Sequence, residues 1–64
     1  MVTKTEIRAI FKEEGAERVS PDAINEVDGR LRTLAEDIAA ESVSLAKHAN
    51  RKTVQEKDVL KAVE

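Results

Sequence analysis

The apolar residues of the chain recur at helical spacing, first in a short segment near the N-terminus that contains Ile7, Ile10 and Phe11. Thr3 and Glu6 precede them in the spacing of a capping box, in which the two residues satisfy each other's backbone N–H groups. Gly15 follows as a residue type that commonly ends helices. The pattern predicts a first helix over about residues 4–14.

A longer apolar pattern begins after Ser20 and Pro21, which suit the N-cap and the first helical position. Its apolar residues recur in steps of three and four at Ile24, Val27, Leu31, Leu34 and Ile38, and Leu45 follows after a stretch rich in Ser and Ala. The pattern continues to Ala49, and Asn50 readily takes the left-handed conformation that ends a helix. We predict a second helix over residues 21–49, about 42 Å long.

The Asp28-Gly29 dipeptide conflicts with this helix, because the same pair is typical of hairpin turns. A glycine inside a helix also costs about 1 kcal/mol relative to alanine. The apolar period nevertheless passes through Gly29 without a change of phase, and neither flank has the composition of a strand. One continuous helix is therefore our prediction, and a helical hairpin broken at Gly29 is the alternative.

The last segment predicts a short third helix. Its apolar face consists of Val59, Leu60 and Val63. Two capping patterns can start it, Thr53-x-x-Glu56 and the weaker Gln55-x-x-Asp58 two residues later. We expect the helix over residues 55–63, which makes the chain an all-α single domain ordered short helix, long helix, short helix.

The apolar face of the long helix is too long for the short helices to cover, since each of them spans roughly 15 Å. The uncovered remainder is large enough to require a partner. A chain of 64 residues is also marginally stable by itself. We therefore predict a two-fold homodimer in which the long helices cross antiparallel and each short helix folds over the partner's apolar face. The isolated monomer is expected to be unfolded or nearly so.

Several classes of function are excluded by composition. The chain has no cysteine, and its one histidine, His48, has no second ligand type beside it in the sequence, so we expect no metal site. No nucleophile with a base, glycine-rich phosphate loop or convergent carboxylate pair is present, so we expect no enzyme, cofactor or small-molecule substrate. No apolar run approaches the ~20 residues of a membrane span, and no signal-peptide pattern is present. We expect a cytoplasmic protein without membrane contact.

The formal charge is −2, from 11 basic and 13 acidic residues, which argues mildly against nucleic-acid binding. Binding depends on the local field, however, and not on the total. Lys4, Arg8 and Lys12 recur every four residues and so form one row on the first helix, called the cationic row below. Arg18 lies in the first link, where turns usually have small polar residues or glycine.

In the predicted dimer, the first link of one chain lies beside the second link of its partner. Val19 and Val54 then pair as short strands that bury their side chains. The pairing directs Arg18, Lys52 and Thr53 outward at each end of the dimer, with the cationic rows between the two ends. Three positive patches therefore lie along one surface.

The sequence that contains these residues resembles the archaeal histones, small histone-fold proteins that dimerise by a handshake and wrap DNA. The resemblance covers almost the whole chain and is densest in "GAERVS", "LAKHANRKTV" and "KDV", with "DIAAESVSLA" in the long helix. It implies a histone fold and a chromosome-associated, nucleoid protein whose partners are double-stranded DNA and itself. It also implies packaging that bends or wraps DNA with little sequence specificity.

The resemblance further implies DNA-binding roles for individual residues. Arg18 matches an arginine that enters the minor groove, and Thr53 matches the threonine that holds it there. Lys52 and Lys12 match lysines that bind phosphates, and the rest of the cationic row extends the DNA path.

The resemblance implies structural roles as well. Arg51 and Asp58 match an ion pair that braces the second link. Leu45, His48 and Asp58 match a contact between dimers, in which the histidine of one dimer donates a hydrogen bond to the acid of the next. Such an assembly would respond between about pH 5 and 7, where histidine titrates. Gly15 matches a small residue where successive turns of a protein–DNA superhelix come close.

The chain also departs from the family pattern. Ala9 stands where the family has a DNA-contacting arginine, although Arg8 is its neighbour. Glu13 and Glu14 put acids near the DNA face, and relatives often continue beyond the position of Glu64 into a short basic tail. We therefore expect weaker and more salt-sensitive DNA binding than in a basic relative. The alternative is a histone-fold interaction module of a transcription or regulatory complex, with weak or no DNA wrapping.

Overall fold

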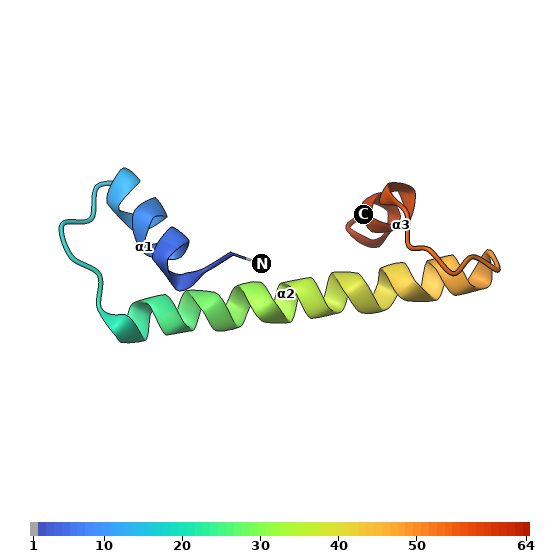
Figure 1. The fold of residues 1–64 in the computed structure, drawn as a ribbon, viewed down its shortest axis with the longest axis horizontal. Helices are drawn as coiled ribbons and strands as arrows, with labels where there is room; N and C mark the ends of the chain where they lie inside the picture. Colours follow the sequence, from blue (N-terminus) through green and yellow to red (C-terminus); the bar gives the residue numbers. More distant parts are fainter. Residues whose placement is uncertain (1) are drawn as a thin grey trace. The chain divides into compact units, whose positions relative to one another are not determined.

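The computed structural model describes residues 2–64, and its three helices are α1 (Lys4–Glu13), α2 (Pro21–His48) and α3 (Glu56–Ala62) (Figure 1). No strand is present within residues 2–64. The all-α order of short, long and short helix is confirmed. Helix α2 runs through Gly29 without a break, so the alternative of a helical hairpin is wrong. Within residues 2–64, no helix combines the length and the hydropathy that a membrane span requires.

Side chains accept backbone hydrogen bonds at the start of each helix. The Thr3 hydroxyl accepts a hydrogen bond from the Glu6 N–H at 3.1 Å, and the Ser20 hydroxyl accepts one from the Ala23 N–H at 3.1 Å. Helix α3 uses the second of its two predicted starts, because Gln55 is extended and its N–H donates to the Asp58 carboxylate at 2.8 Å. These bonds satisfy donors that the first turn of a helix leaves without a partner.

The helices are slightly shorter than predicted, because residues next to their ends occupy caps and turns. Glu14 and Val63 are C-cap residues, Gln55 is an N-cap and Ala49 lies in a turn. The apolar period extends across such positions, while the backbone hydrogen bonds of the regular helix do not.

Helix α1 ends in a Schellman motif. The Ala16 N–H donates to the Phe11 carbonyl at 3.0 Å, and the Gly15 N–H donates to the Lys12 carbonyl at 3.1 Å. Gly15 has φ of 108°, a conformation that residues with a side chain rarely adopt. The glycine therefore allows the chain to reverse directly after α1.

The same motif ends α2. The Arg51 N–H donates to the Ala46 carbonyl at 2.9 Å, and the Asn50 N–H donates to the Lys47 carbonyl at 3.0 Å. Asn50 has φ of 57°, the left-handed conformation that asparagine tolerates better than most residues. The two links of the chain thus begin in the same way.

The chain forms two compact units, which divide between Arg32 and Thr33 within α2. In the first unit Ile7 of α1 and Ile24 of α2 are each 2% exposed. Around them lies a mainly apolar hollow of about 390 Å³, lined by Ile7, Ile10, Phe11, Glu14, Val27 and Leu31. Ile10 and Leu31 remain 54% and 40% exposed, so α1 covers only part of this face.

The second unit has an equally small core, in which Ser42, Ala46 and Asp58 are buried. An apolar hollow of about 470 Å³ lies beside them, lined by Ala35, Ile38, Ala39, Ser42, Val43, Val54 and Val59. Leu60 of α3 and the C-cap residue Val63 are more than half exposed. Helices α1 and α3 thus each bury only a few apolar side chains of their own half of α2, and the single domain expected over residues 1–64 stays a prediction.

Candidate nucleic-acid interface

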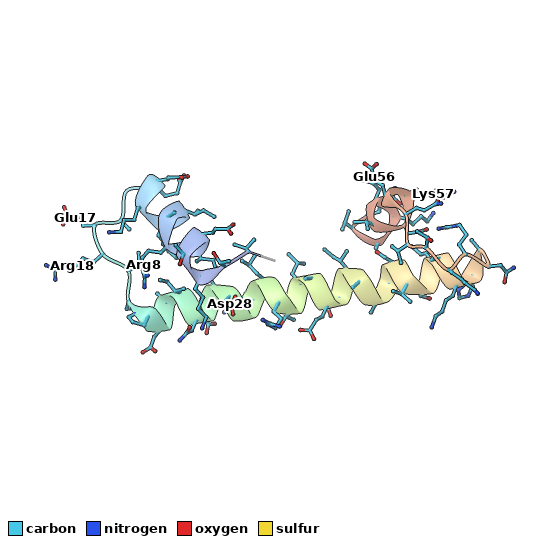
Figure 2. The ribbon with its side chains drawn as sticks, viewed as in Figure 1. Arg8, Glu17, Arg18, Asp28, Glu56 and Lys57 are labelled. Carbon is cyan, nitrogen blue, oxygen red and sulfur yellow. The ribbon has the colours of Figure 1, made fainter. Side chains whose placement is uncertain are left out.

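The first link, residues 14–20, carries Arg18 on its surface. The Arg18 side chain is exposed and points away from α1 and α2 (Figure 2). It makes no hydrogen bond or ion pair with the part of the chain that the structure describes. Val19, the next residue, is half-buried. The Arg18 guanidinium is therefore available to a partner, while the half-buried Val19 side chain anchors the link.

Lys12 connects α1 to this link. Its ammonium donates a hydrogen bond to the main-chain carbonyl of Glu17 at 3.1 Å. That carbonyl belongs to the peptide group that joins Glu17 to Arg18. An ammonium has three N–H donors, so two of them stay available to a phosphate.

The cationic row lies exposed along α1, and Figure 2 shows Arg8 projecting from this helix. Three exposed acids follow it in the sequence: Glu13, Glu14 and Glu17. Ala9 contributes no charge next to Arg8. The acids that follow Lys12 in the sequence lower the positive field near the C-terminal end of the cationic row.

The second link, residues 49–55, is held by an ion pair. The Arg51 guanidinium donates two hydrogen bonds to the Asp58 carboxylate, both at 2.7 Å, in the bidentate arrangement. Asp58 is 4% exposed, and Arg51 is half-buried. The hydrogen bonds from Arg51, followed by the one from the Gln55 N–H, hold the pKa of Asp58 well below its usual range. The hydrogen bond to Asp58 raises the pKa of Arg51, so both groups stay charged together.

The same guanidinium fixes the backbone of the link. One nitrogen of Arg51 also donates to the main-chain carbonyl of Thr53 at 3.2 Å. Lys52 and Thr53 lie exposed on the segment that this bond spans. The Arg51–Asp58 ion pair thus holds the segment that contains Lys52 and Thr53, the two residues for which the resemblance implies DNA contacts.

Lys47 is a further candidate for contact with nucleic acid, and the sequence analysis did not identify it. It lines a hollow of about 320 Å³ together with Arg51 and Lys52, next to Val43, Ala46 and Val54. Lys47 and Lys52 lie on either side of the reversal at Asn50. The sequence contained a signal for this pairing of Lys47 with Lys52, because a left-handed residue such as Asn50 folds the residues before and after it toward each other.

The three residues assigned to a contact between dimers all lie in the second unit. His48 is exposed, and its Nδ1 lies 3.0 Å from the Ser44 carbonyl, to which it donates only when it carries the ring proton. Nε2 is then an acceptor in the neutral ring and a donor in the imidazolium, so only the imidazolium can donate to a partner's carboxylate. Leu45 is half-buried. In Asp58, Oδ2 accepts two hydrogen bonds and Oδ1 accepts one, so Oδ1 has one lone pair left. The contact requires the histidine to reach that single position on a largely buried carboxylate.

Comparison with known proteins identifies the family of the chain. Residues 2–63 match the family described as histone-like transcription factor (CBF/NF-Y) and archaeal histone. The chain is also 48% identical over 54 residues to "Probable archaeal histone 3" of Methanocaldococcus jannaschii, which covers 84% of this chain and 81% of the relative. The chain therefore belongs to the family of histone-like transcription factors and archaeal histones, and its fold is the histone fold.

Proposed function

We propose that this histone-fold protein packages double-stranded DNA, which it bends or wraps as a homodimer with little sequence specificity. The observation that carries the proposal is the construction of the two links. Each link is held by hydrogen bonds within the chain, while the side chains of Arg18 and Lys52 remain exposed. The identity to a probable archaeal histone favours packaging over the alternative of an interaction module.

The chemistry of these residues suits the backbone of DNA better than its base edges. A narrow minor groove concentrates negative potential and accepts an arginine such as Arg18 without requiring a particular sequence. Thr53 holds that arginine in place, while Lys52, Lys12 and the rest of the cationic row neutralise phosphates. Affinity should therefore fall steeply with salt, by about 0.9 log unit per log unit of salt for each neutralised phosphate.

Exposed apolar residues in both units support the homodimer. The larger of them, with exposed fractions from 38% to 58%, include Ile10, Leu31, Leu34, Val43, Val54, Val59, Leu60 and Val63. A second copy that packs along α2 would cover such residues in both units. It would also join the two units into one domain and bring Val19 of one chain beside Val54 of the other.

DNA as the partner places the protein on the chromosome, in the cytoplasm and without a membrane. Packaging DNA through backbone contacts requires no chemical reaction, so we propose no reaction, cofactor or substrate. Contacts between dimers through Leu45, His48 and Asp58 would extend the assembly along DNA. The Nε2 of His48, which is a donor in the imidazolium, and the open acceptor position on Asp58 support this extension.

The test is a gel shift on mixed-sequence DNA at two salt concentrations. We expect the double variant Arg18→Ala/Lys52→Ala to bind more than about tenfold more weakly on all sequences, because it loses a groove contact and a phosphate contact. Lys57→Ala/Lys61→Ala is the matched control, since it removes the same charge from exposed positions on α3. Equal binding by the parent and the Arg18/Lys52 variant would contradict the assigned roles.

A further inference from the structure

We infer that Lys12 is a positioning residue for Arg18. Its ammonium holds the backbone of the first link in the conformation from which Arg18 projects. This role is separate from the phosphate contact that the resemblance implies, and its effect on affinity rests on the proposed function.

The bond that carries the inference lies directly beside Arg18. Lys12 Nζ donates to the Glu17 carbonyl at 3.1 Å, five residues along the chain. The plane of the peptide between Glu17 and Arg18 is rigid, so a bond to its oxygen restrains the N–H of Arg18 as well. Lys12 also accepts the Gly15 N–H at 3.1 Å through its own carbonyl, so one residue holds both the start and the middle of the link.

No other hydrogen bond restrains this stretch. Within residues 2–64, the backbone of residues 17–19 makes no hydrogen bond except the one from Lys12. Neither helix nor strand includes these residues. Without Lys12 the backbone at Arg18 would sample more conformations, and DNA binding would then have to order it.

The second link contains the same kind of bond. There Arg51 donates to the Thr53 carbonyl at 3.2 Å, beside the residues assigned to DNA. In both links a cationic side chain donates to a main-chain carbonyl of the link, from the last turn of α1 in the case of Lys12 and from within the link in the case of Arg51. Arg51 is itself anchored by Asp58, whereas Lys12 is exposed and has two further N–H donors for a phosphate. Lys12 can therefore hold the link and contact DNA together.

A double-mutant cycle separates the two roles. We expect Lys12→Ala to weaken binding to mixed-sequence DNA about tenfold in the parent but only about threefold in an Arg18→Ala background, because a positioning effect is lost with the residue it positions. Arg8→Ala is the matched control, since Arg8 lies in the same cationic row and makes no bond to the link. Its effect should be the same in both backgrounds. An equal effect of Lys12→Ala in both backgrounds would overturn the inference.

A second measurement needs no DNA. In the free protein, Lys12→Ala should lower the ¹⁵N–¹H heteronuclear NOE of residues 17–19, and Arg8→Ala should leave it unchanged. Unchanged values in Lys12→Ala would overturn the positioning role even if affinity falls. If the parent failed to bind DNA, the proposed function would fail, while this measurement would still decide whether Lys12 orders the link.

Discussion

The two links of the chain start alike and are held very differently. Both begin with a Schellman motif, around Gly15 in the first and Asn50 in the second. The first is then held by one exposed lysine hydrogen bond, and the second by a bidentate ion pair to the buried Asp58. A bidentate pair between two charged groups adds two bonds of fixed geometry, whereas Lys12 contributes one exposed bond to a carbonyl. The second link is accordingly the stiffer of the two.

This difference suits the roles that we propose for them. Phosphate contacts fix the register of a protein on DNA, which favours a rigid link beneath Lys52 and Thr53. The width of the minor groove varies with sequence, so an arginine that enters it benefits from a link that can adjust. We therefore expect the second link to set the position of the DNA and the first to adapt Arg18 to it.

The largest effect should follow from breaking the ion pair of the second link. Asp58→Asn leaves the half-buried Arg51 without its counter-charge, so we expect the melting temperature to fall on the order of 10 °C, measured by circular dichroism at fixed protein concentration. Glu56→Gln, an exposed acid in the first turn of the same helix, is the control and should change little. Lys12→Ala, which breaks the bond of the first link, should lower the melting temperature by less than about 2 °C. Similar losses from Asp58→Asn and Lys12→Ala would refute the contrast between the links.

Acidification should reveal the same contrast with a smaller effect. The pKa of Asp58 is lowered in the folded chain, so its contribution is complete above the unfolded value of about 4 and disappears as pH falls through the folded value. We expect the difference in melting temperature between the parent and Asp58→Asn to be constant from pH 8 to about 5 and to shrink below about pH 4. A difference that stayed constant down to pH 2 would mean that the ion pair does not carry the stability of the second link.

The helices could be predicted from the sequence because their signals are local. Apolar spacing, Ser20-Pro21 and the two residues that end α1 and α2 act within a few positions of each other, and each appears in the structure where the pattern placed it. The continuous course of α2 through Gly29 also followed from the unbroken apolar period.

The bonds that hold the links could not be predicted in this way. Whether Lys12 reaches the Glu17 carbonyl depends on the path of the chain after Gly15, which neither the residue types nor their spacing specify. The bond from Arg51 to the Thr53 carbonyl likewise depends on the path of the chain through the second link. The pairing of Arg51 with Asp58 was implied only by the resemblance, because the seven-residue separation crosses a link of unknown conformation.

The central claim is that two chains clasp each other so that the first link of one lies beside the second link of the other. The most direct measurement is disulfide crosslinking between Val19→Cys and Val54→Cys variants, since the parent has no cysteine. When the two variants are mixed, refolded together and oxidised, they should give a covalent dimer on a non-reducing gel, because paired positions in neighbouring strands lie within disulfide reach. Each variant alone should run largely as a monomer on the same gel. A mixture that gives no more covalent dimer than the separate variants would contradict the clasp and the joint DNA surface that depends on it.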